Sequence, residues 1–234
     1  MDLLKKFLHA IRNLDQFLDM LTTEYGVWAY VVLGAIVFAE TGLVVTPFLP
    51  GDSLLFACGA IAMRPNSGLN PVLLGIILIA CAIAGDTVNY HVGKGIGPRV
   101  MKSETSRWLN KKHLEKTHAF FEKYGGKTII LARFVPIVRT FAPFVAGAGA
   151  MNYRRFIVYN IIGAIAWVTS MMGAGMIFGQ MDFVKKHFEA VVLGIVFISL
   201  LPMVIEALKA RAAAKSEAAK VAADKKDADK LPAS

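Results

Sequence analysis

Five charged side chains stand inside otherwise apolar stretches of the sequence: Glu40, Asp52, Asp86, Arg133 and Arg139. A charge at the centre of a membrane helix costs about 2.5–3.5 kcal/mol on insertion scales, so such residues persist where they are paired or functional. Glu40 and Asp52 belong to one segment and the two arginines to another. The two segments are therefore complementary in charge if they meet.

Two interpretations compete for these residues. In the structural one, Glu40 and Asp52 are counter-ions of the arginines and lock the segments together, although buried ion pairs are weak stabilisers. In the functional one, Arg133 and Arg139 bind an anion, because a planar guanidinium donates two parallel hydrogen bonds to a phosphate. A carboxyl group removed from water holds a proton more readily, so Glu40 and Asp52 would exchange protons.

The sequence offers little else for catalysis or metal binding. His113 and His118 are five residues apart, which is the wrong spacing for a shared metal face on a helix. Cys58 and Cys81 lie in apolar segments, which favours buried thiols over a disulfide or a thiolate metal site. We therefore expect a protein that is not an enzyme and that uses neither a metal nor a cofactor.

The composition indicates an integral membrane protein. The 234 residues are 56% hydrophobic and only 18% charged, whereas soluble domains average about 25% charged residues. The apolar residues form long runs, and two of these runs are interrupted by proline and glycine beside the buried charges. Broken backbone at membrane depth is tolerated only where protein or a water-filled cavity covers it. We expect an all-α fold with two re-entrant, broken hairpins and about three full transmembrane helices.

The expected segments follow from helical periodicity, apolar run length and helix breakers. They are an amphipathic surface helix (1–24), a first re-entrant hairpin (25–64), a spanning helix (71–93), a second amphipathic helix (102–124), a second re-entrant hairpin (128–150), spanning helices at 156–179 and 188–208, and a basic tail (209–234) that is disordered in solution. Residues 25–208 would form one transport domain. Its two halves repeat the same order of elements from opposite faces, which is the inverted repeat of many secondary transporters.

The net charge of +9 is concentrated in a few places. Residues 94–127 hold nine Lys/Arg against three Asp/Glu, and residues 209–234 hold seven against four. Beside apolar runs, such basic patches indicate the cytoplasmic membrane face rather than a nucleic-acid site. The C-terminus is therefore expected in the cytoplasm, and the lipid bilayer is the expected partner.

Three motifs resemble the signatures of the bacterial DedA family. They are FAE at 38–40 with PFLPGD at 47–52, GDTVNYHVGKGIG at 85–97, and RFVPIVR at 133–139 with AG at 146–147. The resemblance covers roughly residues 20–208 and implies a multi-pass protein of the bacterial inner membrane. The resemblance also implies that the essential charged residues are Glu40, Asp52, Arg133 and Arg139. Within the same motifs, supporting roles are expected for Asp86, Tyr90, Pro50, Gly51 and Pro136.

The resemblance also implies a flippase-like lipid transporter that supports the cell envelope. It would move undecaprenyl phosphate or a phospholipid between leaflets, driven by the proton motive force. The alternative is a cation/proton antiporter for pH or osmotic homeostasis, because the buried acids outnumber the arginines. A lipid-phosphate phosphatase is a third hypothesis, for which the sequence offers no good nucleophile. The lipid, its direction and the pairing of two chains into a homodimer stay open.

Overall fold

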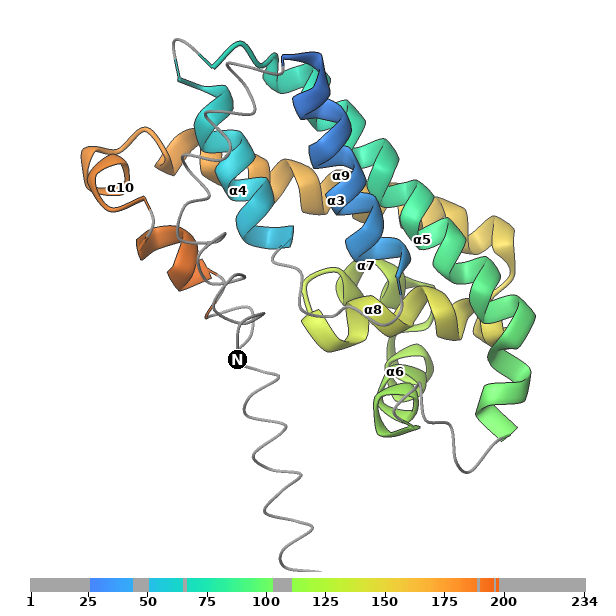
Figure 1. Cartoon of the computed structure of the whole chain (residues 1–234). Helices are drawn as coiled ribbons and strands as arrows, with labels where there is room; N and C mark the ends of the chain where they lie inside the picture. Colours follow the sequence, from blue (N-terminus) through green and yellow to red (C-terminus); the bar gives the residue numbers. More distant parts are fainter. Residues whose placement is uncertain are drawn as a thin grey trace, which may run out of the picture. The chain divides into compact units, whose positions relative to one another are not determined.

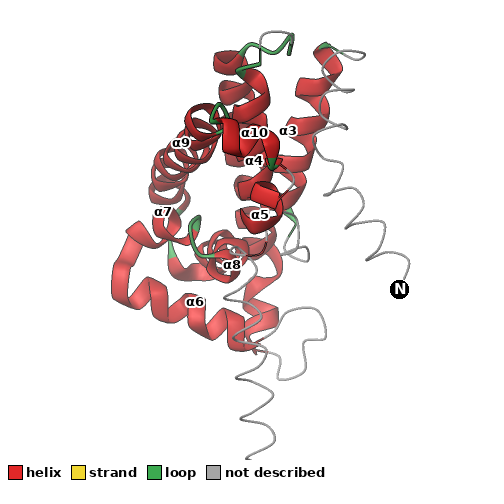
Figure 2. Ribbon diagram, turned by 90° about the vertical axis from the view of Figure 1, so that its left-hand side faces the viewer, coloured by secondary structure: helices red, strands yellow, loops and turns green. Residues whose placement is uncertain are grey.

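The computed structural model describes six stretches of the chain, namely residues 26–43, 51–64, 67–102, 111–188, 190–195 and 197. The chain divides into two units, Met1–Ser199 and Leu200–Ser234, and every described residue belongs to the first. Within this part of the chain all regular elements are helices (Figure 2). The expected surface helix at 1–24, the basic tail, Pro50 and most of the expected 188–208 helix lie outside the described residues.

The first broken segment forms two short apolar helices instead of one straight spanning helix. α3 (Val27–Gly42) is followed by Leu43, whose backbone is extended, and α4 (Gly51–Ala62) begins eight residues after Leu43. Glu40 lies in the last turn of α3, and Asp52 lies in the first turn of α4. The first segment therefore carries its two acids on either side of its break.

α5 (Pro71–Lys102) and α9 (Tyr153–Phe178) are the two long helices (Figure 1). Each follows an asparagine, Asn70 or Asn152, whose side-chain oxygen accepts hydrogen bonds from first-turn N–H groups. Such N-caps satisfy donors that the helix itself leaves free. α5 extends beyond the 71–93 segment expected from the sequence, because the Gly-rich residues after it stay helical.

The two long helices are sufficient in length and apolarity to cross a membrane, over Pro71–Gly97 and Tyr153–Phe178. Their outward faces expose large aliphatic side chains, which a water-soluble helix would bury. These exposed residues are Val72, Leu73, Ile76, Val88, Val158, Ile161, Ile162 and Ile165. The exposed faces suit contact with lipid.

The second broken segment follows the amphipathic helix α6 (Lys111–Tyr124) and a short 3₁₀ turn (Gly125–Lys127). α7 (Thr128–Ala132) stops before Pro136, which is the first residue of α8 (Pro136–Val145). Val135 is extended, as expected for a residue that precedes proline. Arg133 lies in this break and Arg139 lies inside α8.

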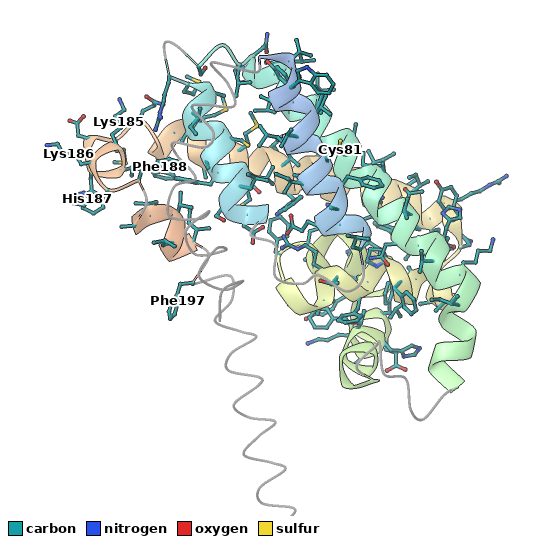
Figure 3. All side chains as sticks on the ribbon, in the orientation of Figure 1. Cys81, Lys185, Lys186, His187, Phe188 and Phe197 are labelled. Carbon is teal, nitrogen blue, oxygen red and sulfur yellow. The ribbon has the colours of Figure 1, made fainter. Side chains whose placement is uncertain are left out.

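Two shorter elements follow α8 and α9. A π-helical turn (Ala146–Ala150) follows α8. It contains Gly149, whose φ of 134° favours glycine. α10 (Asp182–Lys186) follows α9, and Lys186 and His187 point away from the neighbouring helices (Figure 3). Phe188 is buried, with the Arg64 guanidinium 5.5 Å from its ring centre.

Each broken segment has two helices, α3 and α4 in the first half of the chain and α7 and α8 in the second. The second helix of each pair packs on the long helix of the other half. α4 lies against α9, and α8 with the following π turn lies against α5, while α3 and α7 pack on the long helices of their own halves (Figure 1). Glycines make the crossed contacts close. A Cβ at Gly59 or Gly175 would collide with a backbone carbonyl across the α4–α9 contact, and one at Gly93 or Gly147 would do so across the α5 contact.

Gly175 and Gly173 provide a matched test of this packing. We expect Gly175→Ala to lower the free energy of unfolding by about 1–3 kcal/mol, because its methyl group would overlap the Phe56 carbonyl oxygen. Gly173, on the same helix, has open space at its Cβ position, so Gly173→Ala should leave stability unchanged or raise it. Thermal unfolding of both variants in detergent measures the difference, and equal midpoints would contradict the close contact.

Candidate functional site

The centre of the site is Arg139, whose guanidinium bridges both acids of the first broken segment. Its Nη2 lies 2.8 Å from Glu40 Oε1, and its Nη1 lies 2.8 Å from Asp52 Oδ1. The two broken segments therefore meet through their charges. One planar guanidinium joins the end of α3, the start of α4 and α8.

Arg133 has different partners from those in the structural interpretation of the sequence. Its Nη2 lies 2.5 Å from Asp86 Oδ2 of α5 and donates to Asn160 Oδ1 of α9 at 2.6 Å. Asn160 is held in turn, because its Nδ2 donates to the Ile83 carbonyl at 3.1 Å. Asp86 is thus the direct ion-pair partner of an arginine, and Glu40 and Asp52 both serve Arg139.

Trp167 connects the two arginines. Its indole N–H donates to Asp52 Oδ1 at 2.8 Å, the same oxygen that accepts from Arg139. The guanidinium carbons of Arg139 and Arg133 lie 5.2 and 5.7 Å from its ring, within the range of cation–π attraction. Sequence reasoning missed Trp167 and Asn160. Their signal was two polar groups seven residues apart in a spanning helix, a spacing that places both on one face.

The expected supporting residues have different positions around this site. A Cβ at Gly51 would collide with the Glu40 carboxylate, so glycine lets α4 approach that acid. Pro136 begins α8 and so sets the break that precedes Arg139. Tyr90 donates to the Met151 carbonyl at 2.9 Å and stacks on Phe156 at 4.5 Å, which ties α5 to the start of α9.

Asn89 ties the broken segments together without a charge. Its Nδ2 donates to the Thr41 carbonyl at 3.3 Å and to the Thr140 carbonyl at 3.0 Å. Thr41 follows Glu40 and Thr140 follows Arg139, so the amide holds the backbone beside the central ion pair. It is a further residue that the sequence did not single out.

The site is buried yet incompletely paired. Side-chain exposure is 2–5% for Arg133, Asp86 and Glu40, and it rises to 12% for Arg139 and 18% for Asp52. Among the described residues, four buried polar atoms have no hydrogen-bond partner: Glu40 Oε2, Asn89 Oδ1, and Arg133 Nε and Nη1. Unpaired N–H groups on a buried guanidinium suit an anion or water, and an unpaired carboxylate oxygen suits a proton.

No group of three His, Cys, Asp or Glu side chains that could hold a metal ion occurs in the described part of the chain. Cys58 is buried and Cys81 is half-buried, and both are free thiols. The candidate site therefore consists of the charged side chains at the centre with Trp167, Asn160 and Asn89. Its charged groups can bind an anion and exchange protons.

These features define a helical membrane protein with a buried arginine–carboxylate site, and comparison with known proteins names its family. The VTT domain profile matches residues 49–177. Protein DedA of Escherichia coli is 49% identical over 214 residues, which cover 92% of this chain and 98% of DedA. An uncharacterized membrane protein of Mycobacterium tuberculosis is 42% identical, covering 82% of this chain and 87% of its own. The inner membrane protein YghB of Salmonella typhimurium is 32% identical, covering 75% and 78%.

The chain therefore belongs to the DedA family of VTT-domain membrane proteins, and the family resemblance expected from the three motifs is confirmed. The matched region includes four of the five central charges, and Glu40 lies just before it. No solved structure matches the chain.

Proposed function

We propose that this protein is a proton-coupled lipid transporter of the bacterial inner membrane. It moves the phosphate headgroup of undecaprenyl phosphate or a phospholipid between leaflets while the lipid tail stays in the bilayer. The observation that carries the proposal is the Arg139 guanidinium held by Glu40 and Asp52 between two broken membrane segments. An arginine so placed can exchange carboxylates for a phosphate.

The short helices support re-entrant hairpins in this proposal. α3 and α4 contain 16 and 12 residues, about 24 and 18 Å at 1.5 Å per residue, whereas the hydrocarbon core is about 30 Å thick. α7 and α8 are shorter still, with 5 and 10 residues. Each broken segment therefore enters and leaves on one side, and the crossed packing of the second helices suits an inverted repeat. The C-terminus lies in the cytoplasm under this topology.

The charges give a rationale for proton coupling. Three carboxylates face two arginines at the site, so the fully ionised site carries one surplus negative charge that repels a phosphate. Protonation of Glu40 or Asp52 removes that charge and weakens one of the two bonds that hold Arg139. The freed guanidinium edge then binds the headgroup, together with the unpaired N–H groups of Arg133. Release of the proton on the other side returns the carboxylate to Arg139 and expels the headgroup.

Headgroup translocation in proteoliposomes tests the proposal. Wild type and Arg139→Ala would be reconstituted with labelled undecaprenyl phosphate or phosphatidylethanolamine, with and without a pH gradient. Arg154→Ala, at an exposed position in the first turn of α9, is the matched control. We expect gradient-dependent movement of one lipid that Arg139→Ala loses and Arg154→Ala keeps. Folded wild-type protein that moves neither lipid would refute the proposal.

The surplus carboxylate also supports the second candidate, a cation/proton antiporter. In that case the arginines would be structural and a cation would occupy the acids. The same vesicles distinguish it, because an antiporter dissipates the pH gradient on addition of Na⁺ or K⁺ without any labelled lipid. Release of inorganic phosphate from the lipid would instead indicate a phosphatase.

A further inference from the structure

Trp167 is the described side chain that touches both arginines and an acid of the site. It is fully buried, and it lies two turns along the same face of α9 from Asn160, the partner of Arg133. Its N–H bonds Asp52, and its ring lies near the guanidinium groups of Arg139 and Arg133. Any fully buried indole N–H needs an acceptor. Packing alone does not require that this acceptor be an acid of the site, or that two guanidinium groups lie near the ring.

We infer that Trp167 is a positioning residue that holds Asp52 in place while Arg139 is released to the headgroup. The inference rests on the proposed transport function and adds a residue to it. Asp52 Oδ1 accepts from both Arg139 and Trp167. When the guanidinium leaves, the indole bond remains, so the carboxyl group keeps its place and accepts the arginine again after each cycle.

The indole ring also keeps Arg139 at the site by cation–π attraction. Cation–π attraction to a desolvated guanidinium is insensitive to small rotations, unlike a bidentate hydrogen bond. Arg139 can therefore move from its carboxylates toward a phosphate without leaving the indole face. Because Arg133 lies near the same ring, binding at one arginine changes the surroundings of the other.

A kinetic test separates positioning from packing. Trp167→Phe keeps an aromatic ring and removes the N–H, and Trp167→Leu removes both. For Trp167→Phe we expect turnover per folded protein to fall about tenfold, the loss expected for one hydrogen bond to a charged group, while the half-saturating lipid fraction stays within about twofold. Trp167→Leu should also weaken lipid binding, because the guanidinium groups lose their ring. A packing role predicts lower stability with normal turnover in both variants, and that result would overturn the inference.

A fluorescence test keeps Trp167 itself and uses it as the reporter. The sequence has three tryptophans, so Trp28→Phe and Trp108→Phe leave native Trp167 as the reporter. We expect dihexanoyl phosphatidic acid to shift its emission saturably, and to do so much less when Arg139 is replaced by lysine. The control retains Trp28 alone, which is exposed on α3 and should not respond.

The outcomes distinguish the inference from the transport proposal. Calorimetric binding and normal transport with no change in Trp167 emission would overturn the positioning role and leave the transporter standing. Absence of both binding and transport in the wild type would overturn both. A saturable shift in emission, together with the loss of turnover in Trp167→Phe, supports the inference.

Discussion

Replacing Arg139 by lysine is expected to lower the rate of lipid translocation about 100-fold, although the charge is retained. Lysine carries a single ammonium group and cannot hold Glu40 and Asp52 in the two-pronged arrangement that places each carboxylate 2.8 Å from a separate guanidinium nitrogen. One buried carboxylate then loses its charged donor. A loss of about 2.8 kcal/mol, near the upper end for a hydrogen bond to a charged group, corresponds to about 100-fold in rate.

The measurement is gradient-driven movement of the labelled lipid in proteoliposomes, corrected for the amount of folded protein. Arg154→Lys is the matched control, because it makes the same change at an exposed position in α9 and should keep the wild-type rate. Wild-type transport by Arg139→Lys would mean that charge alone suffices at this position.

Replacing Asp86 by alanine should have the largest effect on stability. Asp86 is 3% exposed and is the acid that pairs with Arg133. Its removal leaves a buried guanidinium without its counter-ion, which costs about 3–5 kcal/mol of unfolding free energy. Asn160 still accepts from Arg133 but carries no charge to compensate it.

Unfolding in detergent, followed by helical circular dichroism, measures this loss. Asp182→Ala removes an exposed acid from α10 and should leave the midpoint unchanged. The double variant Asp86→Ala/Arg133→Met should recover much of the stability, because it removes the unpaired buried charge that Asp86→Ala leaves. If Asp86→Ala is no less stable than Asp182→Ala, the ion pair does not hold α5 to the second broken segment.

The membrane segments were predictable because they depend on local properties of the sequence. Apolar run length identified both long helices, and proline with glycine identified the two breaks. Pro136 illustrates this, since it fixes both the extended residue before it and the start of α8. The end of α5 was less predictable, because glycines favour an exit from a helix. In the structure Gly93 packs against α8 and Gly97 against the π turn, and both stay helical.

The charged residues of the site were found because a charge in an apolar run is conspicuous. The structural interpretation paired Glu40 and Asp52 with the arginines, and the structure has this pairing for Arg139. The partners of Arg133 were not predictable, because they depend on which helices cross. Asp86 and Asn160 meet Arg133 only because α5 and α9 both approach the second break. The only signal of Trp167 was its seven-residue spacing from Asn160, and a tryptophan in a spanning helix is ordinarily interpreted as lipid-facing or packed.

The crossed packing of α4 on α9 has a consequence for how the protein is made. All of α4 except Asp52 is buried, largely against a helix that begins roughly 90 residues later in the chain. At about 5–20 residues per second, the ribosome finishes α4 several seconds before its partner exists. During that interval Asp52 has neither Arg139 nor Trp167 beside it. The first half must therefore be inserted in the membrane before its final contacts can form. Folding is complete only when α9 has been synthesised and packs on α4.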